Sequence, residues 1–163
     1  MSLAVEQVKN SIELVTPRLK TFWNDLHSVL PEARLYETFR ENSRQDYLYA
    51  QGRTRSGQII TYATAGNSPH NHGLAFDVVG VNFLKKEEEI RTLLEKNKDI
   101  TWGKDFWGMD PTSKKKFPFP DESHFQIKNW KRIVPGKIGK SDIVFHLLAV
   151  SGIAILNLRS KRK

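Results

Sequence analysis

The chain has 163 residues, 39% of them hydrophobic and 10% aromatic, which is enough to build one globular domain without disulfide support. It contains no cysteine, which excludes disulfides, thiolate zinc sites and cysteine nucleophiles, so only histidine and carboxylate side chains could hold a metal ion. The net charge of +8 favours an anionic partner, which could be nucleic acid, an acidic membrane surface or a bacterial wall that carries acidic polymers.

The N-terminal part of the chain is predicted to be helical. Apolar residues between Val5 and Leu30 recur at helical spacings, and Thr16 followed by Pro17 is typical of an N-cap and a first helical position. We therefore expect one or two amphipathic helices over residues 4–30. The sequence MSLAVEQVKNSIELV has acidic residues and no long apolar run after a basic start, so we expect no secretory signal here.

Strands and helices then alternate along the chain. Residues 33–40 predict a strand that ends at Arg40, with Leu35 and Glu37 on one face and Tyr36 on the other. The remaining expected elements are a helix over 43–51, a strand or irregular segment over 58–63, an apolar strand over 74–79, an amphipathic helix over 85–98, a loop over 101–120 and a final strand over 123–127. These elements predict an α+β fold in which helices flank a small antiparallel sheet.

The C-terminal part has a different character. Residues 143–158 carry no charge and are followed by a basic end, Arg-Ser-Lys-Arg-Lys. This stretch is shorter than the roughly 20 residues that usually span a bilayer. Three alternatives stay open, namely a short membrane anchor, a buried or partner-binding helix, and a pair of strands around Gly152. We expect one domain over residues 1–137 and a tail over residues 138–163.

The segment SPHNHGLAFD, residues 68–77, brings two histidines and a carboxylate close to a predicted strand. Alternation along residues 74–79 turns Asp77 away from Phe76 and its apolar neighbours. A carboxylate buried in such surroundings needs a metal ion or a basic partner. Gly73 permits a tight bend that would carry the preceding loop back over the carboxylate. The alternative is an exposed turn with incidental histidines, and spacing alone does not say which histidine would bind.

A second segment, PDESHFQ at residues 120–126, places two acidic residues before His124. A hydrolytic zinc site needs a general base near the metal. Strand alternation favours Glu122, which would share a face with His124, whereas a turn after the proline would instead deliver Asp121. A solvated acidic turn is the non-catalytic alternative. The two other histidines, His27 and His146, are expected to be structural.

The two motifs together resemble those of a known family. Ser-x-His-x-x-Gly-x-Ala-x-Asp, matched over residues 68–77, resembles the zinc-binding signature of the D-alanyl-D-alanine peptidase superfamily. Asp-x-x-His-Phe-Gln, matched over residues 121–126 downstream of a Trp-Gly pair, resembles the branch of L-alanyl-D-glutamate endopeptidases that includes phage endolysins. The resemblance covers roughly residues 15–130, including the strand end at Arg40 and the sequence Tyr-Ala-Gln-Gly-Arg-Thr at residues 49–54.

This resemblance implies a set of metal ligands and a catalytic base. It implies that His70, Asp77 and His124 bind zinc (Zn2+), whereas His72 occupies a variable position. It also implies that the base is Asp121, against the alternative that strand alternation favours. The zinc ion and the base would together activate the water that attacks a peptide carbonyl.

The resemblance further implies that Arg40 helps to polarise the scissile carbonyl and to stabilise the oxyanion. Ser68 would contact the substrate or fix the loop of the first histidine. Trp102, Phe106 and Trp107 could line the cleft, although core packing is expected for at least one tryptophan.

We therefore expect a zinc-dependent peptidase that hydrolyses peptidoglycan stem peptides, between L-Ala and D-Glu if the nearest branch applies. One alternative is a D,D-carboxypeptidase or dipeptidase on the same scaffold. Another is a non-enzymatic basic protein that binds the wall or nucleic acid, but the dispersed Lys and Arg and the lack of a nucleic-acid motif argue against nucleic acid. The location stays open between release by a phage, membrane contact through residues 143–158, and turnover of wall fragments in the cytoplasm.

Overall fold

The structure is a computed structural model that describes residues 7–109 and 115–135. The chain divides into two compact units, Met1–Trp130 and Lys131–Lys163. The apolar stretch 143–158 and His146 lie outside the described residues, so the expectations for the tail stay predictions. Among the described residues, no helix has the length and apolar character that crossing a membrane requires.

The described residues form α-helices, β-strands and short 3-10 turns. The α-helices are α1 (Pro17–Val29), α2 (Asn42–Ala50) and α3 (Glu87–Lys96). The strands are β1 (Arg34–Glu37), β2 (Ala75–Val79), β3 (Ile100–Trp102), β4 (Trp107–Met109), β5 (Lys116–Pro118) and β6 (His124–Ile127). Short 3-10 turns occur at η1 (Ile12–Leu14), η2 (Pro69–His72), η3 (Gly103–Asp105) and η4 (Trp130–Arg132).

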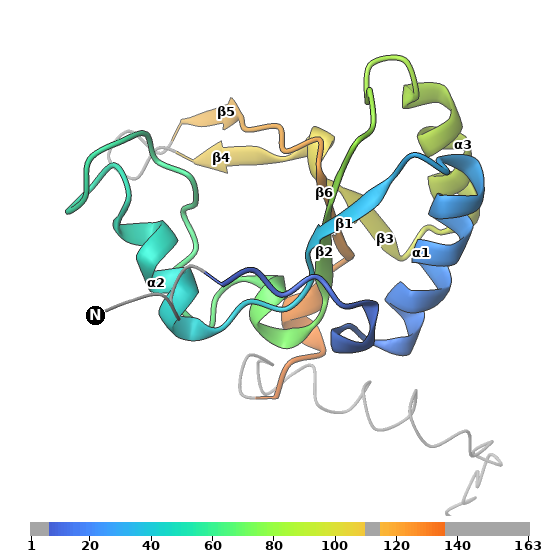
Figure 1. Ribbon diagram of the computed structural model, residues 1–163. Helices are drawn as coiled ribbons and strands as arrows, with labels where there is room; N and C mark the ends of the chain where they lie inside the picture. The colour runs from blue at the N-terminus through green and yellow to red at the C-terminus, as the bar shows by residue number, and fades with distance from the viewer. Residues whose placement is uncertain (1–6, 110–114, 136–163) are drawn as a thin grey trace, which may run out of the picture. The chain divides into compact units, whose positions relative to one another are not determined.

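The strands form one small sheet and one hairpin. The sheet has four strands in the order β1-β2-β6-β3, and each neighbouring pair is antiparallel. Within residues 7–109 and 115–135, strands β4 and β5 pair only with each other, as an antiparallel hairpin. Figure 1 shows α1 and α3 on one side of the sheet and α2 on the other. The predicted α+β fold, with helices flanking a small antiparallel sheet, is confirmed.

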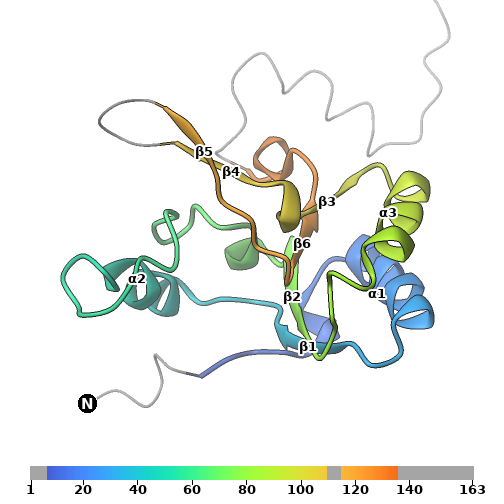
Figure 2. The same cartoon turned by 90° about the horizontal axis from the view of Figure 1, so that it is seen from above.

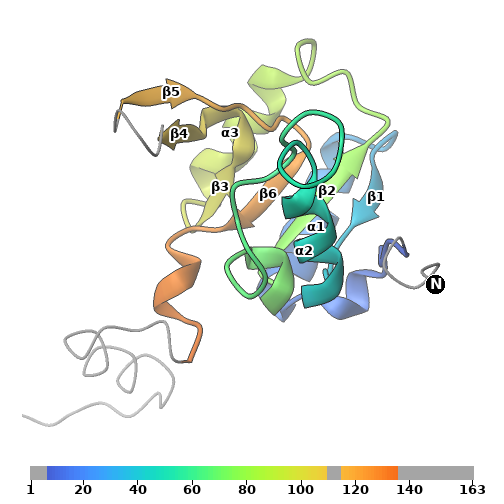
Figure 3. The same ribbon diagram turned by 90° about the vertical axis from the view of Figure 1, so that its left-hand side faces the viewer.

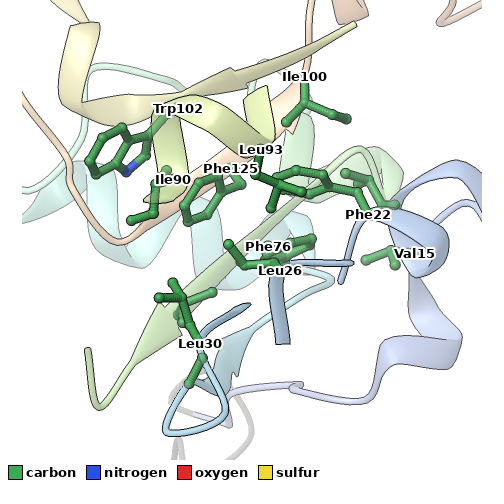
Figure 4. Close-up of a cluster of buried hydrophobic side chains, with 13 residues drawn as sticks. Val15, Phe22, Leu26, Leu30, Phe76, Ile90, Leu93, Ile100, Trp102 and Phe125 are labelled. Carbon is green, nitrogen blue, oxygen red and sulfur yellow. The ribbon is translucent and has the colours of Figure 1, made fainter. Parts of the chain in front are cut away.

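The core lies between α1 and one face of the sheet (Figure 4). Leu19, Phe22 and Leu26 follow the helical period along α1, and all three are fully buried. The Phe22 ring lies 6.1 Å from the ring of Phe76 on β2 and 5.7 Å from that of Phe125 on β6. Because side chains alternate along a strand, the neighbours of these phenylalanines point to the opposite face.

The N-terminal segment is not one continuous helix. Residues 7–11 carry no helix, and Lys9 instead forms an antiparallel bridge with Phe39, beyond the end of β1. The amide of Thr38 donates a hydrogen bond of 2.7 Å to the Lys9 carbonyl. Helix α1 begins only at Pro17, as its capping signal indicates. Tertiary pairing therefore overrides the helical periodicity of the first residues.

The expected loop over residues 101–120 is more ordered than the sequence indicates. It contains the end of β3, the turn η3 and the β4–β5 hairpin. Gly108 in β4 and Pro118 in β5 are residue types that strands disfavour, so local propensity does not reveal the hairpin. The segment 58–63, for which a strand was one alternative, is irregular.

Strand β1 contains an irregularity that simple alternation does not predict. Leu35 pairs with Val78 of β2, whereas Glu37 pairs with Asp77, so the ladder accommodates one extra residue, Tyr36. Leu35 packs against the core. Glu37 faces the other side, together with Asp77, although alternation would place Leu35 and Glu37 on the same face. The irregularity thus turns a carboxylate toward the face of the sheet away from the core.

Candidate active site

Three ligand-type side chains converge on the face of the sheet away from the core. Asp77 on β2 is paired directly with His124 on β6, and directly opposed residues of antiparallel strands project to the same side. Asp77 Oδ1 lies 2.9 Å from His124 Nδ1. His70 Nε2, from the turn η2, lies 3.2 Å from Asp77 Oδ1 and 3.1 Å from His124 Nδ1. All three side chains are buried.

The turn η2 is held in place by its own backbone. Gly73 ends it with a φ of 64°, and a Cβ there would lie 2.6 Å from the Leu14 carbonyl oxygen, so only glycine fits. The Arg40 amide donates a hydrogen bond of 3.1 Å to the His70 carbonyl. The Asn71 side-chain amide donates one of 2.7 Å to the Arg40 carbonyl. These contacts fix the His70 loop above the sheet.

Each imidazole of the cluster has its second nitrogen engaged by an acceptor. His70 Nδ1 lies 3.0 Å from the Thr38 carbonyl, which can only accept, so Nδ1 carries the proton. His124 Nε2 lies 3.0 Å from Gln126 Oε1, which also accepts. In the neutral rings, His70 Nε2 and His124 Nδ1 therefore both present lone pairs to the Asp77 carboxylate. Three electron donors face one another, and only a cation among them relieves their repulsion.

The ionisation of the cluster also favours a cation at this position. Burial would raise the pKa of Asp77, but the charges and hydrogen bonds of His70 and His124 outweigh it and hold that pKa below its ordinary value. Burial would lower the pKa of His124, but its hydrogen bond and charge interaction with Asp77 leave the pKa above the ordinary value. The cluster thus favours a positive charge, which a proton on His124 or a divalent metal ion would supply.

The geometry of the cluster fits a zinc ion. Tetrahedral ligands at ordinary zinc distances lie about 3.3 Å from one another, and the three ligand atoms here are separated by 2.9 to 3.2 Å. Two histidines and one carboxylate leave one coordination position for solvent or substrate, which is the pattern of catalytic rather than structural zinc sites. A hydrogen-bond acceptor at the second ring nitrogen of each histidine is also typical of metal-binding imidazoles.

A buried ion-pair network adjoins this cluster. Arg40 donates to Glu37 Oε2 from Nε and Nη2, at 2.9 and 2.5 Å. Its Nη2 lies 3.5 Å from Asp77 Oδ2, and its Nη1 donates to Gln45 Oε1 at 3.0 Å. Arg44 Nε donates to Glu37 Oε1 at 2.5 Å. Glu37 is only 1% exposed, so its charge is compensated almost entirely by the two arginines.

Sequence reasoning missed three members of this network, namely Glu37, Arg44 and Gln45. The cluster of polar residues that follows the predicted strand was the one available signal. It does not reveal the network, because the extra residue in β1 is what turns Glu37 toward the site. Gln126, which orients His124, belongs to the second motif, but the motif does not by itself indicate that role.

The two acidic side chains before His124 have different surroundings. Asp121 lines the pocket above the cluster, and its Oδ1 accepts a hydrogen bond of 2.7 Å from Ser123 Oγ. Glu122 does not line that pocket, and its Oε1 lies 3.1 Å from Lys104 Nζ. Strand alternation fails here because β6 begins only at His124 and the preceding residues form a turn.

Ser68 lies in the pocket wall, whereas His72 and His27 lie outside the cluster. Ser68 is buried in the pocket wall, at the start of η2, where its amide donates to Asn71 Oδ1 at 3.2 Å. His72 points elsewhere, because its Nε2 bonds to the Gly66 carbonyl at 3.0 Å and its ring lies against Trp130. His27 is exposed on α1. The structure thus brings together His70 and not His72.

A pocket of about 390 Å³ opens above the three ligand-type residues. Tyr36, Ile60, Phe106 and Phe119 all contribute to its lining. Figures 1 and 2 show α2, the loop that follows it and the β4–β5 hairpin on the side of the sheet away from α1 and α3.

Of the three aromatic residues expected in the cleft, only Phe106 lines it. Trp102 belongs to the core, where it is 1% exposed and stacks on Phe125 at a centroid distance of 6.0 Å. Trp107 on β4 is 65% exposed and does not line the pocket.

Comparison with known proteins connects this site to a family. Residues 12–108, more than half of the chain, match the VanY model, described as D-alanyl-D-alanine carboxypeptidase. The chain is also 58% identical over 41 residues to peptidoglycan L-alanyl-D-glutamate endopeptidase CwlK of Bacillus subtilis (strain 168). That alignment covers 25% of this chain and 25% of CwlK, so the chain spans a quarter of this curated relative.

Two solved structures show a distant likeness. The LdcB LD-carboxypeptidase is 20% identical with a TM-score of 0.46, over 80% of this chain and 72% of that chain. DacB from Streptococcus pneumoniae D39 is 20% identical with a TM-score of 0.47, over 79% of this chain and 72% of that chain. At these values the likeness says nothing about activity. Because the family model matches more than half of its length, the chain belongs to the VanY family of D-alanyl-D-alanine carboxypeptidases.

Proposed function

We propose that this protein is a zinc-dependent peptidase that hydrolyses the stem peptides of bacterial peptidoglycan between L-Ala and D-Glu. The observation that carries the proposal is the convergence of His70 Nε2, Asp77 Oδ1 and His124 Nδ1 beneath a pocket. Membership of the VanY family supports peptidase chemistry. The local identity to CwlK supports the choice of bond.

In this proposal the three converging side chains hold the metal, and Asp121 is the general base. A bound zinc ion would polarise the scissile carbonyl and lower the pKa of water toward about 7. Asp121 lines the same pocket, and its carboxylate accepts the proton of the attacking water and passes it to the leaving amine. The hydroxyl of Ser123, which donates to Asp121 Oδ1, orients this carboxylate.

Arg40 has two tasks in the proposed mechanism. Its guanidinium places a fixed positive charge beside the site, where negative charge develops on the carbonyl oxygen. It also lies 3.5 Å from Asp77 Oδ2 and so steadies the carboxylate that faces the metal. Ser68, in the pocket wall, contacts the substrate beside His70.

A second candidate is D,D-carboxypeptidase activity, which the description of the matching family model favours. The two activities leave different products, so one digestion separates them. Incubation with purified peptidoglycan should release peptides with new D-Glu amino termini if the protein is an endopeptidase. Free D-Ala in place of these termini would support the carboxypeptidase.

The assignment of the base is tested by a matched pair of variants. Asp121→Ala should keep one bound zinc but lower kcat at least about 100-fold, because a general base contributes about 10²- to 10⁴-fold. Glu122→Ala, its neighbour outside the pocket, should cleave at a rate close to that of the unaltered protein. His124→Ala should lose both zinc and activity. Full activity in Asp121→Ala together with an inactive Glu122→Ala would overturn the assignment.

A further inference from the structure

The turn that carries the proposed base is a β-turn. Asp121 and His124 are its first and last residues, because the His124 amide donates a hydrogen bond of 3.1 Å to the Asp121 carbonyl. Glu122 and Ser123 lie between them and are joined by the central peptide group of the turn. The orientation of this peptide group is what differs between the common types of β-turn. It therefore governs the direction of the side chains on either side of it.

The indole of Trp102 holds this central peptide group. Trp102 Nε1 donates a hydrogen bond of 2.7 Å to the Glu122 carbonyl, which is the oxygen of that group. The donor is fixed in the core, because Trp102 is buried and its ring lies within 1° of parallel to that of Phe125 (Figure 4). Trp102 and Phe125 are paired residues of β3 and β6, which run side by side in Figure 3.

Ser123 connects the central peptide group to the base. It supplies the nitrogen of that group, and its Oγ donates a hydrogen bond of 2.7 Å to Asp121 Oδ1. Its carbonyl accepts a hydrogen bond of 2.9 Å from the Val78 amide of β2. A rotation of the peptide group would carry the Ser123 hydroxyl away from the Asp121 carboxylate. A continuous series of contacts thus leads from Trp102 in the core to the carboxylate that lines the pocket.

The acceptor of the indole distinguishes this contact from ordinary core packing. A buried indole N–H needs an acceptor in any protein. Here the acceptor belongs to the turn that separates the proposed base from a proposed ligand. The side chain of Glu122 is held as well, because Lys104 Nζ lies 3.1 Å from Glu122 Oε1 and 3.0 Å from Glu87 Oε2 on α3. Glu122 is therefore fixed outside the pocket through both its carbonyl and its side chain.

We infer that Trp102 is a positioning residue, which acts through the turn to hold the Asp121 carboxylate in the orientation that catalysis needs. This inference rests on the proposed function, in which Asp121 is the base. Proton transfer requires the base to lie within hydrogen-bond reach of the attacking water, so a misdirected carboxylate lowers the rate. His124 is held separately by its pairing with Asp77, so zinc binding should not depend on the indole contact.

The test removes the indole N–H and keeps an aromatic ring in the core. On a soluble stem peptide with an L-Ala–D-Glu bond, zinc-loaded Trp102→Phe should have a kcat lowered about tenfold, the order of one hydrogen bond. KM and the bound zinc should be unchanged, because the contact serves the transition state only. Trp107→Phe is the matched control, because Trp107 is 65% exposed and lies outside the pocket lining, and it should keep its kcat.

A second variant tests the same series of contacts without altering the core. Ser123→Ala removes the hydroxyl beside Asp121 and should lower kcat by a similar factor. Because both residues act through one route, the double variant should be no slower than the slower single variant. Losses that multiply in the double variant would overturn the inference. An unchanged kcat in Ser123→Ala would also overturn it, even if Trp102→Phe did not fold.

The remaining outcomes separate this inference from the proposed function. An unchanged kcat in folded Trp102→Phe, or a loss of bound zinc that accounts for its lower rate, overturns the inference alone. An equal loss of residual activity when Trp102→Phe is added to Asp121→Ala also overturns it, since the indole would then act independently of the base. If the unaltered, zinc-loaded protein does not cleave the soluble peptide at its L-Ala–D-Glu bond, the proposed function itself fails.

Discussion

Single side chains on the site face carry an unusual density of buried charge. Glu37, Asp77 and His124 occupy paired positions across β1, β2 and β6, and Arg40 lies beside Glu37 and Asp77. Burying a charge is costly unless a partner compensates it. Glu37 compensates the charges of two arginines at once, because Arg40 and Arg44 both donate to its carboxylate.

Glu37 is therefore predicted to be a major determinant of stability. Glu37→Ala would leave Arg40 and Arg44 buried without their shared acid, and breaking such a pair costs about 3–5 kcal/mol of unfolding free energy. Urea denaturation measures this loss. Glu41→Ala is the matched control, because the ion pair of Glu41 with Lys9 is accessible to solvent, with side chains 54% and 39% exposed, and it should cost about 1 kcal/mol or less. Equal losses in both variants would contradict the prediction.

The motifs identify individual site residues only where those residues lie within a short stretch of sequence. The first two proposed ligands, His70 and Asp77, lie in one short segment, and His124 lies in the second motif. Glu37 carries no such signal, because its role depends on an extra residue in the ladder between β1 and β2.

Among the elements, the turn η3 controls the position of the second motif. The Asp121 amide donates a hydrogen bond of 2.9 Å to the Gly103 carbonyl. A Cβ at Gly103 would lie 2.3 Å from the Asp121 carbonyl oxygen and 3.0 Å from His124 Cβ. The close approach of η3 thus requires glycine, and it places the proposed base and one proposed ligand together.

Gly103→Ala is predicted to displace this turn. The clash involves backbone, so the turn before β6 must shift, and a displaced ligand should weaken zinc binding about 10- to 100-fold. Competition with a chromophoric chelator measures the affinity. Gly66→Ala serves as the control, because nothing lies within 4 Å of the added Cβ and only its φ of 71° is strained. The prediction fails if Gly103→Ala binds zinc as tightly as Gly66→Ala.

Three separate elements of the molecule meet at the cluster of proposed ligands. The turn η2 and the strands β2 and β6 contribute one ligand each. An ion that binds all three in the folded state, and not in the unfolded chain, stabilises the fold by mass action.

Removal of zinc should therefore lower the thermal midpoint. Zinc added to chelator-treated protein at about 100 times its Kd should restore about 2.7 kcal/mol. Differential scanning calorimetry with and without zinc checks this shift. His70→Ala removes one ligand and should show little response, whereas His72→Ala should respond as the unaltered protein does, because His72 lies outside the cluster. A full response in His70→Ala would count against the proposed site.

The sequence by itself determined the elements whose signals are local. Periodicity predicts the amphipathic character of α1 and of α3, and Ile90 and Leu93 form the buried face of α3. Alternation predicts that Phe76 and Asp77 face opposite sides of β2. The two motifs, through their resemblance to a known family, predict which side chains form the cluster.

Only the tertiary structure decided what depends on pairing between distant segments. The extra residue Tyr36 in the β1–β2 ladder and the contact between Tyr62 and Phe119 depend on residues that are remote along the chain. The turn that directs Asp121 and Glu122 to different surroundings is also held by a hydrogen bond from the Asp121 amide to the Gly103 carbonyl of η3. Periodicity reports the environment along one segment, whereas register and side-chain partners arise from contacts between segments. For this reason the proposed ligands could be predicted from the sequence, and the ion-pair network beside them could not.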